Sequence, residues 1–365
     1  MMKKILLAAA LMGGILDFHP AEEVVPWLEG SRATLSVWGQ PAPAPSLTLL
    51  QMSDLHGDAE NLARVVEFKQ AYGGYIEDAI HLGDAVYCYW DDPNPWDEVK
   101  GAEKILNTVG NHDCWKGHLL WAQSNRPYDA TAEEAYSLIM EGKDKSAPFI
   151  DNWGVVSPGR GLCYYYKDYK QQNIRLIVLD CMHYDPAQDK WFTYVLEDAA
   201  AKGLTVVGAQ HYPAWSGLDK IPGGFSDMDL DIPVMTSPSH LDTPGGPQME
   251  CMADEAFTRV DRFIEAGGIF ACWLSGHTHL DFIGHIPGHS RQLQIIADKA
   301  GAKDGYMQEA RTRGTRLQDA FNLVTINTSR GTLFVKRIGC DRDQYMRSKS
   351  YFTYNYLTGK VIVNE

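Results

Sequence analysis

The sequence predicts an α/β fold with two β-sheets and helices on their outer sides. Its first half alternates short apolar runs with helical patterns, whereas its second half is rich in strand-like runs without helices between them. The chain has 365 residues, of which 45% are hydrophobic, so it can form one large domain or two ordinary ones with an ample core. This composition excludes a disordered or collagen-like chain.

The first half of the expected fold begins with a strand and a helix. Residues 47–52 (LTLLQM) form a short apolar run, which is typical of a buried strand. Residues 60–72 place Leu62, Val65 and Phe68 at helical spacing, and the glycine pair that follows would end this helix. Further strands are expected at 79–82, 105–109, 163–169 and 173–180, the last two joined as a hairpin.

The second half of the expected fold begins with two helix–strand pairs. A helix is expected at 189–202, where Gly203 ends it, and a strand follows at 204–209. The second pair is a helix at 257–266 and a strand at 269–274. Four more strands then follow without helices between them, at 281–286, 293–296, 321–327 and 332–338.

Changes in composition mark the expected domain boundaries. Residues 39–46 (GQPAPAPS) hold three prolines, which indicates an extended linker at the end of an N-terminal segment, 21–46. The main domain is expected at 47–340, and residues 341–365 are expected to form a C-terminal extension. Insertions are expected near 115–160 and 212–250, and the second, rich in Gly, Pro, Ser and Asp, is typical of a loop.

The first 20 residues resemble a signal peptide. Lys3 and Lys4 precede an uncharged apolar run at 5–16, which Asp17 ends. This run is too short to cross a bilayer, so no stable membrane span is expected. The pattern favours export to the periplasm or the exterior. The alternative is a buried N-terminal element of a cytoplasmic protein, because no clean cleavage site follows the run.

The charge of the chain limits its partners. It has 33 Lys and Arg against 47 Asp and Glu, which gives a formal net charge of -14. A general nucleic-acid binder needs a basic face, so no nucleic-acid partner is expected, and adhesion to anionic lipid is disfavoured. A small anionic substrate is still compatible, because a cleft sets its own local field. The seven cysteines form no CxxC pair and indicate neither a disulfide framework nor a zinc ribbon.

Five polar motifs follow strand-like runs, and their side chains have the chemistry of metal ligands. In open α/β sheets, ligands bind beyond the carboxyl ends of the strands, so we expect the motifs to share one crevice. A mixture of carboxylate and imidazole ligands suits Mn, Fe or Zn. The five motifs offer seven candidate ligands, which are too many for one ion, so two ions that share a bridging carboxylate are expected. The motifs are Asp54-Leu55-His56, Gly83-Asp84, Gly110-Asn111-His112-Asp113, Gln210-His211-Tyr212 and Gly276-His277-Thr278-His279.

The order of these motifs (DxH, GD, GNHD, H and GHxH) resembles that of the calcineurin-like metallophosphoesterases. The resemblance implies a four-layer fold, in which a β-sandwich is flanked by helices, and a centre of two divalent transition metal ions (Mn, Fe or Zn). It also implies catalytic roles for two residues. His112 would lie close to the substrate, and Asp113 would orient His112. Carried over by position, the resemblance implies that one ion is bound by Asp54, His56 and His279. The other ion would be bound by Asn111, His211 and His277, and Asp84 would bridge the two ions.

Other residues near the motifs have alternative interpretations. His183 also follows a strand and competes with His211 for the fourth motif. Tyr87 completes a GDxxY pattern that is similar to that of purple acid phosphatases, but His56 already fills the first motif, so a core or pocket position is expected for Tyr87. The aromatic residues near the motifs indicate either a ring-binding wall or ordinary packing; they are Tyr87, Tyr89, Trp90, Trp96, Trp115 and Trp121. The cluster of Arg311, Arg313 and Arg316 is typical of a solvated loop, and the alternative is a phosphate clamp.

The resemblance and the ligand set together predict a phosphoesterase. The expected reaction is hydrolysis of a phosphomonoester or phosphodiester of a small molecule by metal-bound hydroxide. His112 would donate a proton to the leaving oxygen or would form a hydrogen bond with a phosphate oxygen. One alternative is a metal-dependent hydrolase of another bond, such as an amide or a sulfate ester. The other is a non-catalytic binding protein on the same fold. The expected partner is a small phosphorylated substrate, and the oligomeric state is left open.

Overall fold

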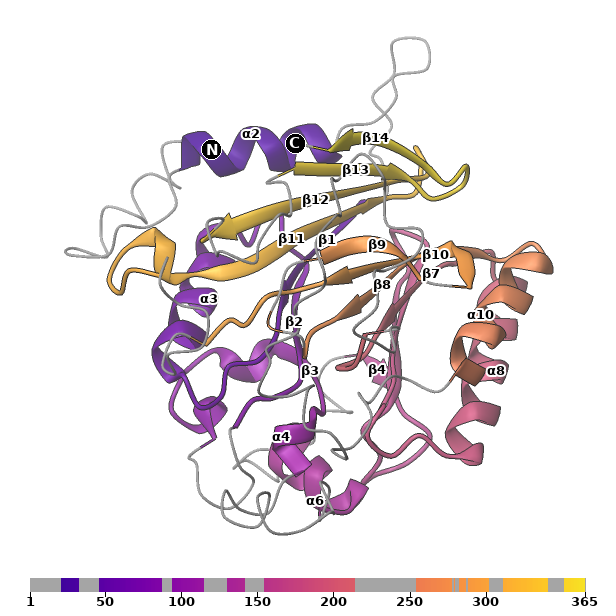
Figure 1. Ribbon diagram of the computed structural model, residues 1–365, viewed down its shortest axis with the longest axis horizontal. Helices are drawn as coiled ribbons and strands as arrows, with labels where there is room; N and C mark the ends of the chain where they lie inside the picture. The colour runs from indigo at the N-terminus through magenta and orange to yellow at the C-terminus, as the bar shows by residue number, and fades with distance from the viewer. Residues whose placement is uncertain are drawn as a thin grey trace, which may run out of the picture.

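The computed structural model describes residues 21–32, 46–86, 94–114, 130–141, 154–213, 254–277, 279, 282–286, 288–301, 311–340 and 351–364. Two sheets of seven strands pack face to face, and helices lie on their outer sides (Figure 1). This arrangement confirms the predicted fold class. Within the described ranges, no helix combines the length and the apolar character that crossing a bilayer requires.

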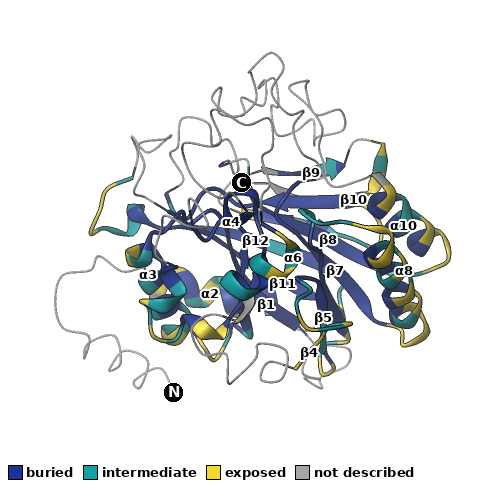
Figure 2. Ribbon diagram, turned by 90° about the horizontal axis from the view of Figure 1, so that it is seen from below, coloured by how far each residue is buried: buried dark blue, intermediate teal, exposed yellow. Residues whose placement is uncertain are grey.

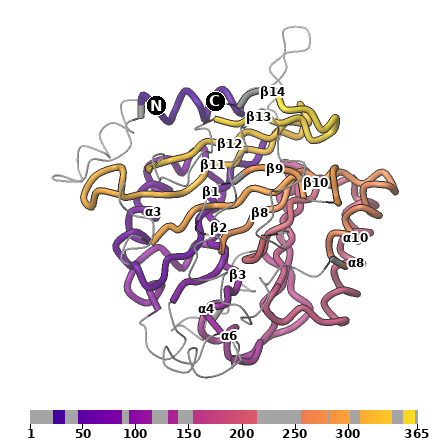
Figure 3. Tube along the Cα trace, in the orientation of Figure 1, coloured from indigo at the N-terminus to yellow at the C-terminus, as the bar shows by residue number. Residues whose placement is uncertain are grey.

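The first sheet combines strands from both ends of the chain. Its order is β14-β13-β12-β11-β1-β2-β3. β1 pairs in parallel with β2 and in an antiparallel register with β11, so segments far apart in sequence lie side by side (Figure 3). The strands are β1 Ser46–Met52, β2 Asp78–Leu82, β3 Ile105–Thr108, β11 Ala320–Asn327, β12 Thr332–Gly339, β13 Tyr351–Asn355 and β14 Lys360–Asn364.

The second sheet uses the middle of the chain. Its order is β4-β5-β6-β7-β8-β10-β9, and β6, β7, β8 and β10 run parallel. β5 and β6 pair in an antiparallel register, which confirms the predicted hairpin. The strands are β4 Val155–Val156, β5 Tyr165–Tyr169, β6 Ile174–Val178, β7 Thr205–Ala209, β8 Ile269–Ser275, β9 Phe282–Ile286 and β10 His289–Ile296.

Four longer helices form the outer layers of the molecule (Figure 1). α2 Ala21–Arg32 and α3 Ala59–Ala71 cover the first sheet, and α8 Pro186–Ala201 and α10 Asp254–Glu265 cover the second. The side chain of Asp58 caps α3, which fixes where this helix begins after β1. The short helical segments are α4 Asn111–Cys114, α6 Ala132–Tyr136, η1 Pro95–Asp97, η2 Ala102–Lys104, η3 Ser137–Glu141 and η5 Arg316–Gln318.

Apolar residues on both faces of the strands form separate cores. Because side chains alternate along a strand, Leu49 of β1 packs between the sheets and Leu50 packs against α3. Every residue of β1 is buried, which explains why its sequence is a continuous apolar run without alternation. Figure 2 shows the buried strands between the more exposed helices. A third core joins α8 and α10 to the second sheet through Phe192 and Trp273.

Two segments outside the expected strand–helix pattern contribute to the fold. Residues 21–32 form α2, whose Val24 and Leu28 are buried against the first sheet. Part of the expected C-terminal extension forms β13 and β14, which lengthen that sheet. Residues 39–45 of the expected linker and much of both expected insertions lie outside the described residues, as does the N-terminal run, so export stays a prediction.

Candidate metal centre

The seven expected ligands all lie just beyond the carboxyl ends of five strands. The loops after β1, β2 and β3 of the first sheet meet the loops after β7 and β8 of the second. The backbone N–H of His277 donates to Asp54 Oδ2 at 2.9 Å, and His211 Nδ1 lies 2.6 Å from the carbonyl oxygen of Leu82. These contacts join the two sheets at one edge, so the expected crevice is formed by both sheets.

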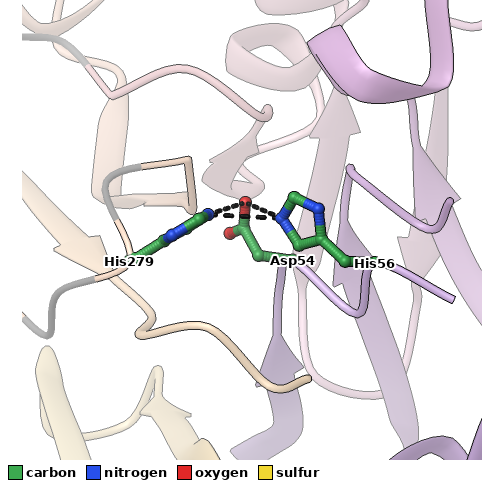
Figure 4. A group of neighbouring side chains, drawn as sticks. All are labelled: Asp54, His56 and His279. Atoms are coloured by element: carbon green, nitrogen blue, oxygen red, sulfur yellow. Dashed lines mark hydrogen bonds and ion pairs between the residues drawn. The ribbon is translucent and has the colours of Figure 1, made fainter. Parts of the chain in front are cut away.

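Three side chains form a first group (Figure 4). Asp54 Oδ1 lies 3.3 Å from His279 Nε2 and 3.7 Å from His56 Nε2. The two imidazole Nε2 atoms are 3.3 Å apart. Zinc is bound at about 2.1 Å by such ligands, which places two ligand atoms of one ion about 3.0–3.4 Å apart. Both distances to His279 Nε2 lie in this range, and the distance of 3.7 Å between Asp54 Oδ1 and His56 Nε2 is slightly longer.

A second group forms around His211. Its Nε2 lies 3.3 Å from Asp84 Oδ2 and 2.8 Å from Asn111 Oδ1, and its ring centroid is 5.0 Å from that of His277. Since His211 Nδ1 contacts the carbonyl oxygen of Leu82, this nitrogen donates the hydrogen bond and Nε2 faces the group. Asp84, His211 and His277 offer ligand atoms within 4.8 Å of one another.

Asp84 lies between the two groups. Its Oδ2 is 3.3 Å from His211 Nε2 and 3.9 Å from His56 Nε2, while its Oδ1 accepts the backbone N–H of His112 at 2.8 Å. Within the described ranges, Asp54 Oδ1 and Asp84 Oδ2 are buried and accept no hydrogen bond. A buried, unsatisfied carboxylate oxygen is costly, and a cation would remove that cost. The donor set therefore fits bound metal ions.

The backbone at the site is strained. The left-handed conformation costs roughly 1–3 kcal/mol for a residue other than glycine. Five of the expected ligands adopt it, namely Asp54 (φ 55°), His56 (48°), Asp84 (59°), His277 (70°) and His279 (55°). An extended backbone therefore does not aim the Asp54–His56 and His277–His279 pairs. Hydrogen bonds from Asp54 N to Gly83 O and from His56 N to Asp84 O, both 3.0 Å, hold the strained loop instead.

Burial and crowded carboxylates shift the pKa values of the site. Burial, together with the charge of Asp54, raises the pKa of Asp84 although His211 opposes the shift. Burial and the neighbouring Asp84 raise the pKa of Asp113 to about 7. Burial lowers the pKa of His211, but the Asp84 carboxylate outweighs it and raises that pKa to about 9. Divalent cations would relieve this repulsion and replace the proton on His211.

His112 and Asp113 occupy different places. The His112 side chain is buried, and its ring meets that of His56 edge-on at a centroid distance of 4.5 Å. Asp113 is expected to orient His112, and this role stays a prediction. Its carboxylate accepts backbone N–H groups at 2.9–3.2 Å, from Asp84, Ala85, Val86 and Gly110. Asp113 therefore holds the loops after β2 and β3 together.

The alternative ligand His183 lies apart from both groups. Its Nδ1 is 2.9 Å from Asp180 Oδ2, and its Nε2 is 3.1 Å from the carbonyl oxygen of Ala130. Both ring nitrogens are thus engaged, whereas His211 faces Asp84 and Asn111. The structure therefore favours His211 at the fourth motif.

The remaining residues near the motifs take structural positions where they are described. Trp96 packs on His81 with ring centroids 4.8 Å apart, and Arg311 forms a buried ion pair with Asp298 at 2.8 Å. Arg313 pairs with Glu60 of α3, and Arg316 pairs with Glu23 of α2. These two arginines are therefore not arranged as a phosphate clamp. Five aromatic residues lie outside the described residues, namely Tyr87, Tyr89, Trp90, Trp115 and Trp121.

Two residues near the centre had no expected role. Lys299 follows β10 and is 3% exposed, and burial lowers its pKa to about 8 while Asp54 opposes the shift. The strand-end rule that located the ligands applies equally to Lys299. Tyr212 is buried, and its ring lies 4.5 Å from that of His277, in an edge-on contact that limits how the imidazole can turn.

A substitution at Gly110 tests how tightly the site is packed. A Cβ atom at this position would lie 2.2 Å from Asp84 Oδ1 and 2.4 Å from the Asp84 backbone nitrogen. Gly110→Ala should therefore displace Asp84, lower the free energy of unfolding by about 1–3 kcal/mol and reduce the amount of bound metal. Denaturant unfolding and elemental analysis measure these effects. Gly74→Ala, with nothing within 4 Å, is the matched control, and equal behaviour of both variants would contradict the packing described.

The fold and this edge together define an α/β protein with a carboxylate–imidazole cluster suited to divalent metal ions. The family model of the calcineurin-like phosphoesterases matches residues 47–281, which is more than half of the 365-residue chain. The chain belongs to this family.

The chain is similar to solved structures at low sequence identity. A dimetal phosphatase from Danio rerio is 12% identical, with a TM-score of 0.52, and the match covers 85% of this chain and 99% of that one. A purple acid phosphatase from yellow lupin (Lupinus luteus) is also 12% identical, with a TM-score of 0.47, over 88% of this chain and 57% of that one. No curated protein matches the chain.

Proposed function

We propose that the chain is a dinuclear metal-dependent phosphoesterase that hydrolyses a phosphomonoester or phosphodiester of a small molecule. The observation that carries this proposal is the pair of ligand groups that share Asp84. Its Oδ2 lies 3.9 Å from a ligand nitrogen of the first group and 3.3 Å from one of the second. Family membership and the dimetal phosphatase among the similar structures support the same conclusion.

The chain supplies a distinct set of ligands for each ion. Asp54, His56 and His279 would hold one ion, and Asn111, His211 and His277 the other, with Asp84 between them. The mixture of oxygen and nitrogen donors suits Mn, Fe or Zn. When bound, such ions lower the pKa of a coordinated water toward 7 and neutralise charge on phosphate oxygens.

His112 is the side chain best placed for proton transfer. It is 2% exposed, its ring lies against that of His56, and its backbone N–H is fixed by Asp84 Oδ1. It would donate a proton to the leaving oxygen of the ester. Asp113 would act indirectly, because its four backbone hydrogen bonds fix the loops that carry Asp84 and His112.

A substrate panel tests the proposed activity. The purified protein is assayed on phosphomonoesters, phosphodiesters, nucleotides, amides and sulfate esters with added Mn²⁺, Zn²⁺ or Mg²⁺ and with EDTA. We expect hydrolysis of a phosphoester that requires a transition metal and that EDTA abolishes. Hydrolysis of an amide or sulfate ester alone would replace the proposed reaction, and metal binding without any hydrolysis would point to a binding protein.

The pH dependence of metal binding follows from His211. Its pKa is raised from 6.5 to about 9, so in the metal-free protein the imidazolium stabilises the fold below pH 6.5, and this contribution is lost as the pH rises through 9. A metal ion must displace this proton. The affinity for Mn²⁺ should therefore rise by up to about tenfold per pH unit below 9. Titration with Mn²⁺ at pH 6, 7 and 8 measures this slope, and an affinity that does not change with pH would contradict it.

A further inference from the structure

A cavity of about 460 Å³ lies at the edge of the fold opposite the candidate metal centre. The loop 267–268 with the start of β8 and the start of β10 form one wall, and the end of β13 with the following turn forms the other. The two walls come from different sheets, which His285 Nε2 and Tyr354 Oη join at 3.1 Å. A cavity of this size is typical of a small-molecule site.

The walls of the cavity are largely rigid and partly apolar. Ile269 and Phe270 belong to β8, and Tyr354, which is 2% exposed, belongs to β13. At the rim, the side chain of Leu357 is 56% exposed although it is a large hydrophobic residue. An apolar ligand would cover this exposed leucine and replace water against the aromatic rings.

The charge of the cavity is opposite to that of the chain. The chain has a net charge of -14, yet neither Asp nor Glu is among the described residues that line the cavity, and Arg291 is. Arg291 is exposed and forms no ion pair with any described residue. Ser290 and Thr358 add hydroxyl groups to the same lining. One unpaired guanidinium beside hydroxyl donors suits a single carboxylate or phosphate group.

We propose that this cavity binds a small organic anion, with its apolar body against Tyr356 and Leu357 and its acidic group on Arg291. The site is separate from the metal centre, because Ile269 begins the seven-residue strand β8 and the loop of His277 follows its other end. That strand spans roughly 20 Å. Ser290, Arg291 and the residues of β13 lie beyond the residues 47–281 that the family model matches, whereas Ile264 and residues 267–270 lie within them.

A titration with 4-phenylbutyrate tests the proposal on the full chain. Butyrate and 4-phenylbutan-1-ol are the comparison probes, since each lacks one of the two recognised parts. Ligand-observed NMR, with and without Mn²⁺, measures the dissociation constants. We expect 4-phenylbutyrate to bind at about millimolar concentration or tighter, and at least tenfold more tightly than either comparison probe.

Two exposed positions provide the variants. Arg291→Gln should weaken 4-phenylbutyrate by about tenfold or more, and Ser290→Glu should weaken it through repulsion. The control variant Arg316→Gln removes one positive charge from an exposed position near the helices of the first sheet. It should leave the affinity for 4-phenylbutyrate unchanged. Equal affinity of wild type and Arg291→Gln, absence of binding, or binding that depends on Mn²⁺ and not on Arg291 would overturn the proposal.

Discussion

Asp84→Asn is expected to lower the metal content from two ions per chain to one or none and to reduce phosphoesterase activity about a thousandfold or more. Asp84 Oδ2 faces a nitrogen of each group, His56 at 3.9 Å and His211 at 3.3 Å. An amide cannot neutralise two cations, and changes even in residues behind the ligands commonly cost about 10–100-fold. Elemental analysis and the rate with the best phosphoester measure the effect.

The control for this change is Asp78→Asn. Asp78 begins β2, and Asp84 lies in the loop after the other end of this strand. Asp78 accepts hydrogen bonds from Lys167 and Tyr169 at 2.8 and 2.6 Å, so its loss should lower the free energy of unfolding while both ions stay bound. Full turnover and two ions in Asp84→Asn would refute the shared centre. Equal loss of metal in both variants would show that the effect comes from destabilisation.

His112→Ala is expected to keep the metals and to lose rate by about 10²–10⁴-fold, which is the usual contribution of general acid catalysis. Its Nε2 and Nδ1 are not needed by either ligand group described above, although a ligand atom of His112 lies within 4.8 Å of those of His56 and Asp84. The loss should be largest for substrates with poorly leaving alkoxides, because these depend most on a donated proton.

His289→Gln is the matched control for His112→Ala, because His289 pairs with Asp261 on the outer side of the second sheet. It should retain both metal content and rate. If His112→Ala loses an ion, His112 is a ligand and the proposed role as acid is wrong. If it keeps the full rate on every substrate, His112 takes no part in the reaction.

Local patterns predicted most of the strands, and the parts that they missed have physical reasons. The buried runs at β1, β6 and β8 are largely apolar, so they indicate strands without reference to the rest of the chain. α2 has a Pro inside the helix and depends on packing of Val24 and Leu28. In β13, Phe352 and Tyr354 alternate with less buried positions, which is a pattern typical of a strand.

The sequence could predict which residues form the candidate site, but it could not predict their geometry. Strand ends and residue types alone brought together Asp54, Asp84 and His211, which lie within one cluster. The left-handed backbone of the ligands is set by hydrogen bonds between loops, so spacing along the chain does not reveal it. Asp113 lies next to His112 in sequence, yet the four N–H groups that converge on it come from two different loops.

The most direct test of the central claim is anomalous diffraction from crystals of the protein grown with Mn²⁺. Two peaks are expected at the edge where the sheets meet. One would lie among Asp54, His56 and His279, the other would be bound by the second group, and Asp84 would contact both. A single peak, or manganese bound only elsewhere on the molecule, would contradict the dinuclear centre.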